Sequence, residues 1–554
     1  MQQDPPPIFP SPDPGARDAL RAVLHQAADT VADYLTEVGN RPIFPLQAES
    51  PATEALPEFG QPLPEAFQQA AEWAIEQSIH VHHPGYAGHM DSGVAVAGIV
   101  ADFLVSALNQ NLLAYELAPG ATLLEKKLLE EFRLLAGLPE GAGGTFTTGG
   151  TGANLAALLS ARDAACRDSS RFGLTRGRHG VPPTAPLCLL ASADAHYSIQ
   201  KAAAILGLGS DRVLPVPVAG PERRLDPEAL PKVLEQAVHR GLQPFALVAT
   251  AGTTSCGAID PIHACADFCE QHGLWLHVDG AHGGALLFHP QARNRLAGIH
   301  RADSLSLDPH KWLYAPKSAG LVLLRQVDDL VPAQYEAPYL DRFSDHGEAL
   351  PVSQGRRALD GSRRFDAFKV WLILRHLGRR GLGKLLDDRL ALTRWFHQRL
   401  SEHAFFLPKH IPDTNVQTFA PRASKEIPRI AEAHRALEAT GRLWSSYTRL
   451  DGRPCHRVVL LNPAGEQHHL EGILATLEGA HRGLAEAGQT PASPFPPGNS
   501  SSNPDNPTIA KAAAGGYAKE CEKPAKEALN DRGQGDEALL HSASEFRHRR
   551  RPET

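Results

Sequence analysis

The sequence predicts an α/β protein with a mainly parallel sheet in a large domain, followed by a smaller C-terminal α+β domain. Short apolar runs rich in Val and Leu alternate with helix-like stretches through the middle of the chain. Most of these runs precede polar or glycine-rich turns, as expected for parallel strands with helices on both faces. The length of 554 residues exceeds what a single core usually organises, so more than one domain is expected.

The elements follow from hydrophobic periodicity. Apolar residues recur at helical spacing over residues 18–39 and 63–79, joined by a Pro-rich connection, which indicates an N-terminal helical arm too thin to bury its own core. A long amphipathic helix is predicted over residues 119–138. The predicted strands are PLCLLAS, VLPVPV, FALVAT, LWLHVD, SLSLD and GLVLLR, with RVVLLN at 457–462 in the small domain.

Composition excludes several classes of function. The net charge of -7, with both signs interspersed, argues against a nucleic-acid partner. The N-terminus has acids and prolines where a secretory signal would be basic and then apolar, and no run is long enough to span a membrane. Seven scattered cysteines favour reduced thiols, so we expect a cytoplasmic protein. The group His263, Cys265 and Cys269 lies in an apolar, helix-like stretch, which favours buried structural cysteines, and no metal site is predicted.

A glycine-rich turn offers a place for an anion. In FTTGGTGANL, Gly149, Gly150 and Gly152 permit close approach of a ligand to the backbone, and Thr151 adds a hydroxyl. The amides at the start of the following helix favour a phosphate. An ordinary tight connection between strand and helix has the same composition, and the turn lacks the lysine of a P-loop.

Further polar groups follow other predicted strands. His196 and Thr254 each follow one, Asp279 ends LWLHVD, and His310 and Lys311 come after SLSLD. Taken singly, such residues are more often caps, turn residues or surface charges. A carboxylate at the rim of a buried sheet, however, requires a partner. Together the groups provide an anion site, a ring for stacking, a carboxylate and an amine, which are the needs of pyridoxal phosphate.

These residues resemble the group II pyridoxal-phosphate-dependent amino-acid decarboxylases, the family of glutamate, cysteine-sulfinate, diaminobutyrate and aromatic amino-acid decarboxylases. The resemblance runs from about His82 to Arg457. Its motifs are D-P-H-K-W, T-T-G-G-T-x-A-N-L, the A-H at 195–196, A-T-A-G-T-T and V-D-G-A-H-G-G. It implies fold type I (aspartate-aminotransferase-like) architecture, pyridoxal 5'-phosphate as cofactor, and a homodimer with active sites at the subunit interface.

The resemblance also implies roles for individual residues. Lys311 corresponds to the Schiff-base lysine, Asp279 to the partner of the pyridinium nitrogen, and His196 to the ring stacked on the cofactor. These three are the expected catalytic residues. The remaining cofactor contacts that it implies are Ala281 on the opposite face, Gly150, Thr151 and His310 at the phosphate, and Thr254.

A substrate pocket is implied by the same comparison. His89 and Met90 lie in the corresponding stretch, although a solvated histidine cluster is an alternative there. Asn111 and Leu113 are expected to enter the pocket from the partner subunit, and Arg457 to bind the substrate's α-carboxylate. The segment ALNQNLLAYELAPGATLLE is closer to the relatives with acidic substrates, which favours a small polar or acidic amino acid.

The implied reaction is decarboxylation of an L-amino acid, through an external aldimine, to the amine and carbon dioxide. Two departures from the family bear on it. The stretch DRFSDHGEALPVSQGRRALDG lacks the tyrosine that helps protonate the carbanion in relatives, which leaves His346 or water as donor. The alternatives are a decarboxylation-dependent oxidative deaminase that forms an aldehyde, or a non-catalytic homologue. Asp308 stands where relatives often have Asn, so we expect one weaker cofactor contact or repulsion near the phosphate.

The expected organisation has four parts, and the last is assigned as disordered because it is poor in large apolar residues. They are residues 1–119, an N-terminal helical arm with the substrate-pocket segment; 120–365, the large PLP-binding domain; 366–488, the small C-terminal domain; and 489–554, the tail.

Overall fold

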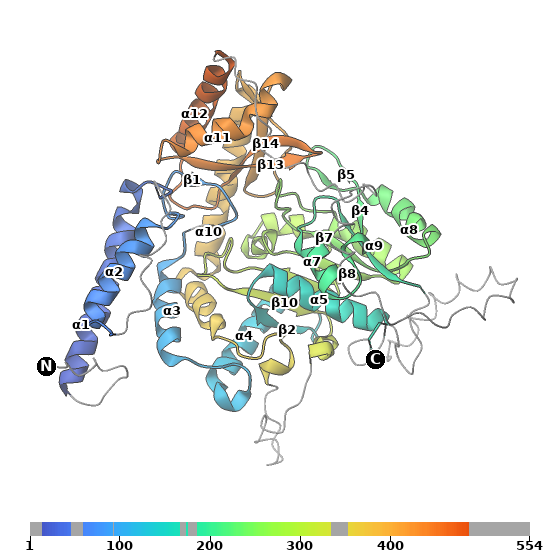
Figure 1. Cartoon of the computed structure of the whole chain (residues 1–554). Coiled ribbons are helices and arrows are strands. Elements are labelled where there is room, and N and C mark those ends of the chain that lie inside the picture. The colour runs from blue at the N-terminus through green and yellow to red at the C-terminus, as the bar shows by residue number, and fades with distance from the viewer. Residues whose placement is uncertain are drawn as a thin grey trace, which may run out of the picture.

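The computed structural model describes residues 14–45, 59–91, 93–166, 173–174, 185–333 and 353–486. A seven-stranded sheet, in the order β2-β10-β9-β8-β7-β3-β4, forms its centre (Figure 1). Side chains on this sheet alternate between two hydrophobic clusters, so that Cys188 and Leu190 of β3 face one cluster while Leu189 and Ala191 face the other. The strands are β2 (Gly143–Thr147), β3 (Leu187–Ser192), β4 (Val213–Val216), β7 (Gln243–Thr250), β8 (Trp275–Asp279), β9 (Ser304–Leu307) and β10 (Gly320–Leu324).

The sheet is mainly parallel, as predicted, but β10 runs antiparallel to both of its neighbours, β2 and β9. Apolar composition does not report strand direction, so the sequence could not distinguish this strand from the others. The short connection 308–319 contains no helix in the structure, whereas a parallel return requires a crossover. This connection carries the DPHKW motif.

Helices cover both faces of the sheet. The amphipathic helix predicted over 119–138 is confirmed as α4, and the glycine-rich turn leads directly into α5. Residues of α5 and α7 contribute to one hydrophobic cluster, and residues of α4, α8 and α9 to the other. The bounds are α4 (Pro119–Ala136), α5 (Gly150–Ala165), α7 (Ser198–Ile205), α8 (Leu230–His239) and α9 (Ile262–His272).

A second sheet of five strands, ordered β1-β13-β14-β12-β11, lies apart from the first (Figure 1). The strand predicted at 457–462 is displaced, because β14 begins and ends earlier in the chain. Unexpectedly, β1 from the N-terminal region pairs with β13, which brings the segment before His89 onto this sheet. The elements are β1 (Tyr86–Ala87), β11 (Phe406–Pro408), β12 (Val416–Pro421), β13 (Trp444–Leu450), β14 (Arg453–Val459), α10 (Asp366–Glu402, interrupted at Gly378), α11 (Ile430–Glu438) and α12 (Gln467–Glu486).

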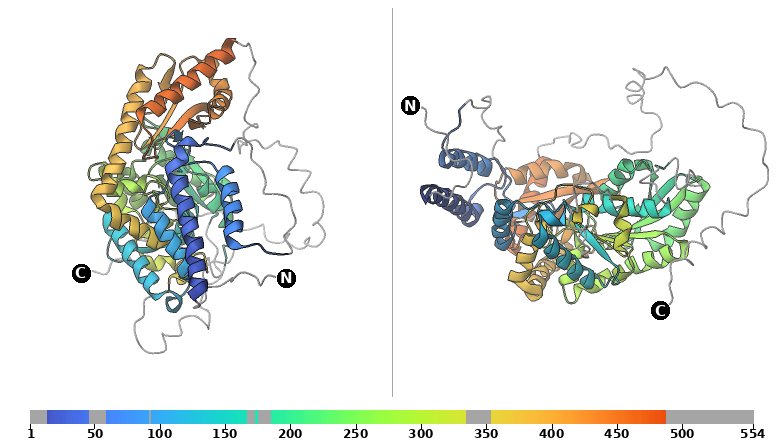
Figure 2. Two further views of the ribbon diagram at one scale, coloured as in Figure 1. Left: turned by 90° about the vertical axis from the view of Figure 1, so that its left-hand side faces the viewer. Right: turned by 90° about the horizontal axis from the view of Figure 1, so that it is seen from below.

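Helices α1 (Pro14–Glu37) and α2 (Leu63–Glu76) stand beside the rest of the structure (Figure 2). Their described residues are all exposed or half-buried, as expected for an arm without its own core. Helix α3 (Val96–Leu108) packs against α10. None of the helices that the structure describes combines the length and apolarity needed to cross a bilayer. A two-stranded hairpin, β5 (Val218–Ala219) and β6 (Arg224–Leu225), completes the described strands.

Candidate active site

Lys311 lies in the connection after β9, and its amine faces a carboxylate. The distance from Lys311 Nζ to Asp308 Oδ2 is 3.3 Å. The backbone N–H of Lys311 donates to the carbonyl of Asp308 at 3.0 Å, which closes a turn between the two residues. Lys311 is therefore held in a defined turn and is not a free surface lysine.

Asp308 is buried, with 3% of its surface exposed. Its Oδ2 also lies 3.7 Å from Nε2 of His310, while its Oδ1 has no hydrogen-bond partner in the described structure. A Cβ added to Gly150 would lie 2.9 Å from Oδ2, and one added to Gly320 would lie 2.8 Å from Oδ1. The carboxylate is thus packed against two glycines, where side chains would collide with it.

The glycine-rich turn brings the start of α5 against these residues. Gly149 precedes the helix with φ 152° and ψ 179°, and a Cβ there would lie 3.1 Å from Cε1 of His310. A Cβ on Gly150 would lie 3.0 Å from that of Ala281. The first amides of a helix have no intrahelical partner, so those of Gly150 and Thr151 can bind an anion between His310 and the helix.

Asp279 lies at the end of β8 and is almost completely buried. Its Oδ2 accepts a hydrogen bond from Asn154 at 2.9 Å, and its Oδ1 accepts from the amide of Ala281 at 3.1 Å and from Ser306 Oγ at 3.2 Å. Burial alone would raise the pKa of Asp279, but the charge of Lys311 and these hydrogen bonds hold it below its usual value. The carboxylate is ionised and fixed in position.

His196 is half-buried in the turn after β3. Its Nδ1 lies 2.9 Å from Ser198 Oγ, and its ring centroid lies 4.2 Å from that of the exposed Tyr197. Burial lowers the pKa of His196; the charge of Asp279 opposes this shift, whereas the charge of Lys311 adds to it. The ring is therefore neutral at pH 7 and lies within electrostatic reach of both residues.

Arg457 is a buried cation on β14, with 5% of its surface exposed. It donates to Ser446 Oγ at 2.9 Å and to the carbonyl of Thr254 at 2.8 Å, and its Nη2 lies 2.9 Å from Nδ1 of His89. Burial lowers the pKa of Arg457. Within the described ranges, no carboxylate forms an ion pair with it, so the guanidinium has neutral partners only.

The structure does not bring every predicted residue to this group. Met90 is buried in the main hydrophobic cluster. Asn111 accepts hydrogen bonds from the amides of Leu113 at 3.0 Å and Arg363 at 3.1 Å. That Asn111 and Leu113 enter the pocket of the partner subunit stays a prediction, because the structure describes a single chain. The prediction for His346, and that for the tail, fall outside the described residues.

Sequence reasoning missed the polar side chains behind the site. Asn154 and His277 are buried and hydrogen-bonded to each other at 3.0 Å. His282 stacks on Trp312 with ring centroids 5.1 Å apart, and its Nε2 lies 2.6 Å from Asn415 Oδ1. A signal was present for His277, since it is a polar residue within the apolar strand LWLHVD and must find partners.

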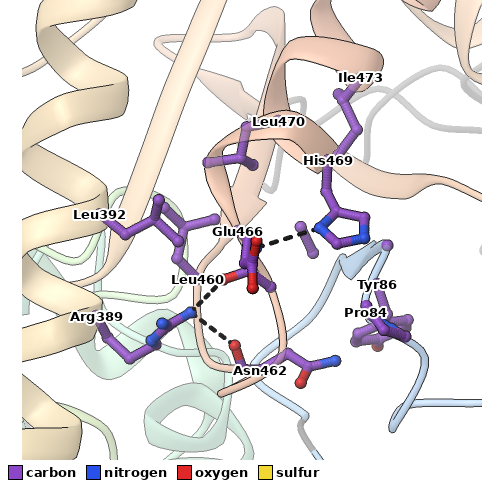
Figure 3. A pocket seen from close by; sticks show the side chains of 13 residues that line it. Pro84, Tyr86, Arg389, Leu392, Leu460, Asn462, Glu466, His469, Leu470 and Ile473 are labelled. Carbon is purple, nitrogen blue, oxygen red and sulfur yellow. Dashed lines mark hydrogen bonds between the residues drawn. The ribbon is translucent and has the colours of Figure 1, made fainter. Parts of the chain in front are cut away.

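A separate cavity lies between the 84–87 segment, α10 and α12 (Figure 3). Arg389 points towards it and donates to the carbonyls of Asn462 and Gly465, both at 2.8 Å. None of the predicted site residues lines this cavity. It is a junction between segments and not the site built around Lys311.

The model of the family described as "Pyridoxal-dependent decarboxylase conserved domain" matches residues 45–418. The chain belongs to this pyridoxal-dependent decarboxylase family. Its resemblance to the group II decarboxylases is therefore confirmed. So are its nature as an amino-acid decarboxylase and its cofactor, pyridoxal phosphate.

Individual relatives of this decarboxylase agree. It is 34% identical over 471 residues to an L-2,4-diaminobutyrate decarboxylase of Rhizobium meliloti (strain 1021), covering 83% of this chain and 92% of the relative. It is also 34% identical over 395 residues to the acidic amino acid decarboxylase GADL1 of Bos taurus, covering 70% of this chain and 73% of the relative. The crystal structure of mouse CSAD in apo form superposes with a TM-score of 0.75 at 29% identity, covering 84% of this chain and 99% of the CSAD chain. These findings confirm the fold type I prediction.

The residues present fit the cofactor of the family. Lys311 supplies an amine, and Asp279 supplies an ionised carboxylate. The start of α5 supplies backbone donors, and its glycines carry no side chain that would fill the space beside them. One feature of the fit is unusual, since the buried carboxylate of Asp308 lies against the same helix start.

Proposed function

We propose that this decarboxylase acts on an L-amino acid with a small polar or acidic side chain, whose α-carboxylate is bound by Arg457. The observation that carries this proposal is the buried guanidinium, whose described partners are all neutral. A buried cation without a counter-ion is costly, and an incoming carboxylate would remove that cost. The planar guanidinium also suits two parallel hydrogen bonds to a carboxylate.

The remaining roles are proposed from the positions of the chain's own residues. Lys311 would anchor the cofactor covalently, and His310 with the amides of Gly150 and Thr151 would hold its phosphate. Asp279 would bind the ring nitrogen. We assign His196 and Ala281 to the two faces of the ring.

When bound, pyridoxal phosphate supplies a conjugated ring that accepts the electrons left behind as carbon dioxide departs. The chain contributes orientation and charge. Asp279 would provide a fixed negative charge for the ring nitrogen, since its pKa is held low despite burial. Arg457 positions the α-carboxylate, and its link to the carbonyl of Thr254 joins that contact to the loop after β7.

The side chain of the substrate is proposed from His89. This residue is bound to Arg457, and burial together with the Arg457 charge lowers its pKa, so its imidazole is neutral at pH 7. A neutral imidazole can hydrogen-bond a short polar or acidic group. Relatives named as diaminobutyrate and acidic amino acid decarboxylases support substrates of this size.

We also propose a homodimer in which α3 faces the partner subunit. The outer side of α3 exposes a row of apolar residues at helical spacing, including Val100 at 57% and Phe103 at 56% exposure. Such a row is typical of an interface. The arm formed by α1 and α2 stands on the same side of the molecule as α3 (Figure 1). The other members of the row are Val96, Leu104 and Leu108.

A cytoplasmic location is proposed from the cysteines. Six of them lie in the described part of the chain, and all six are free thiols. Free buried thiols are typical of a reducing compartment.

A panel of amino acids tests the function. The purified enzyme, loaded with pyridoxal phosphate, is incubated with each amino acid, and carbon dioxide, amine and hydrogen peroxide are measured together. The proposal expects amine and carbon dioxide in equal amounts from a short polar or acidic substrate. Peroxide in amounts matching carbon dioxide would instead identify the oxidative deaminase, and preference for an aromatic substrate would overturn the substrate class.

A further inference from the structure

A continuous chain of hydrogen bonds lies behind the candidate site. Trp275 Nε1 donates to Ser304 Oγ at 2.8 Å, and Ser304 Oγ lies 2.9 Å from Nδ1 of His277. On the other side of this imidazole, Nε2 lies 3.0 Å from Oδ1 of Asn154. All four side chains are buried. The hydrogen-bond chain therefore crosses from strands β8 and β9 to helix α5 through the interior of the protein.

The amide of Asn154 divides the chain into two branches. Its Nδ2 donates to Asp279 Oδ2 at 2.9 Å and to Ser198 Oγ at 3.0 Å. Ser198 Oγ in turn lies 2.9 Å from Nδ1 of His196. One amide group thus connects the carboxylate proposed for the ring nitrogen with the imidazole proposed for the ring face.

The groups at the two ends of this hydrogen-bond chain, Asp279 and Trp275, determine which atom donates in each bond. An ionised carboxylate only accepts hydrogen bonds, so Asn154 must present its nitrogen to Asp279 and its oxygen to His277. His277 therefore carries its proton on Nε2. Because burial lowers the pKa of His277 to about 4, the ring is neutral and its Nδ1 accepts from Ser304. The hydroxyl of Ser304 is free to donate there, since it accepts from the indole of Trp275.

The second branch fixes the tautomer of His196. Ser198 Oγ accepts from Asn154, so its own hydrogen is directed to Nδ1 of His196. The backbone N–H of Ser198 also points to this nitrogen, at 3.3 Å. With two donors facing Nδ1, the neutral ring carries its proton on Nε2. No described residue binds Nε2, which remains the donor that His196 offers to the site.

We propose that Asn154 is a positioning residue that fixes, with one amide group, both the carboxylate of Asp279 and the Nε2–H tautomer of His196. This proposal rests on the proposed function, because it assigns both controlled groups to the cofactor. Asn154 touches neither cofactor nor substrate in this scheme and acts through its two partners.

Two variants separate the branches. Asn154→Leu keeps the branched shape of the side chain but removes both donors, whereas Ser198→Ala removes only the branch to His196. We expect Asn154→Leu to weaken binding of pyridoxal phosphate to the cofactor-free enzyme about 10- to 100-fold, as for a lost hydrogen bond to a charged group. Ser198→Ala is expected to bind the cofactor as the parent does. Equal cofactor affinity of Asn154→Leu and the parent would overturn the assignment.

The tautomer itself is measured by nitrogen-15 NMR of the histidine-labelled, cofactor-free enzyme, with the His196 signals identified by their loss in His196→Gln. The parent is expected to show an unprotonated Nδ1 and a protonated Nε2. Both Ser198→Ala and Asn154→Leu should show a mixture of tautomers. A proton on Nδ1 in the parent, or an unchanged tautomer in both variants, would contradict the proposal.

A second pair of variants guards against misfolding of Asn154→Leu. His277→Gln keeps a donor facing Asn154, whereas His277→Glu, of nearly equal size, offers acceptors when ionised. We expect His277→Gln to retain its affinity for the cofactor and His277→Glu to lose it. Similar affinities in both variants would contradict the donor and acceptor roles assigned to Asn154. None of these readouts requires turnover, so they stand apart from the amino-acid assay by which the proposed function fails or succeeds.

Discussion

The carboxylate of Asp308 lies 3.3 Å from the amine of Lys311. It also packs against Gly150 at the start of α5, where a larger side chain would collide with it. It forms an ion pair with the lysine that would anchor the cofactor, at the helix end that would bind the phosphate. A negative charge there opposes an anion, so we expect Asp308 to weaken cofactor binding.

We therefore expect Asp308→Asn to bind pyridoxal phosphate more tightly by about 10-fold, which corresponds to about 1.4 kcal/mol from one removed like-charge contact. Titration of the cofactor-free enzyme, followed by absorbance, measures the change. The matched control is Asp211→Asn, whose side chain is 72% exposed and outside the site. Weaker binding by Asp308→Asn would mean that the carboxylate supports the cofactor instead.

Asp279→Asn keeps the shape of the side chain but removes its charge. Because this charge would stabilise the protonated ring nitrogen, decarboxylation is expected to fall at least about 100-fold while the fold is retained. Product formation and circular dichroism measure the two effects. Unchanged turnover in this variant would disprove the assignment of Asp279.

Arg457→Lys replaces a planar fork by a point charge. We expect kcat/KM for the amino acid to fall about 10- to 100-fold, since one of two charged hydrogen bonds is lost. Inhibition by the product amine, which has no α-carboxylate, should be unchanged. Arg453→Lys, on the same strand but exposed, serves as the control. Equal losses for substrate and amine would indicate a general disturbance of the site.

The exposed row on α3 predicts an effect on assembly. Val100→Asp and Phe103→Glu place charges in the proposed interface, so the apparent mass in solution is expected to fall from dimer to monomer, with loss of activity. Light scattering coupled to gel filtration measures this mass. The exposed Lys232→Glu on α8 should leave it unchanged. A dimer that persists in both α3 variants would place the interface elsewhere.

Buried histidines predict acid sensitivity. Burial lowers the pKa of His277 to about 4 and that of His282 and His434 to about 3, from the usual 6.5. Between pH 6.5 and 4 the unfolded chain binds more protons than the folded one, so the free energy of unfolding decreases as the pH falls. The slope is about 1.4 kcal/mol per pH unit for each such histidine. Urea midpoints across this range test it.

The variant His434→Gln should reduce that slope by one histidine, whatever its effect on absolute stability. The matched control is His468→Gln, whose side chain is 69% exposed. An identical slope in His434→Gln and the parent would show that His434 does not titrate differently in the folded state.

The buried strands and the polar residues that follow them could be predicted from the sequence, because buried parallel strands have a recognisable composition. Strand direction could not, as β10 demonstrates, because the same apolar residues suit either direction. Lys311, Asp279 and His196 could be selected as chemically unusual residues. The residues that hydrogen-bond to them could not be selected in this way. The role of Asn154 depends on the tertiary structure, which places Asp279 and Ser198 within 3 Å of its amide.

The contact between Arg457 and Thr254 has a consequence for engineering. The guanidinium belongs to the five-stranded sheet, whereas the carbonyl it binds follows a strand of the seven-stranded sheet. The proposed binding of the α-carboxylate by Arg457 would therefore depend on both sheets, and we expect a chimera that exchanges only one sheet to lose part of this contact. We expect that a change of substrate specificity in a chimera requires the five-stranded and the seven-stranded sheet to be exchanged together.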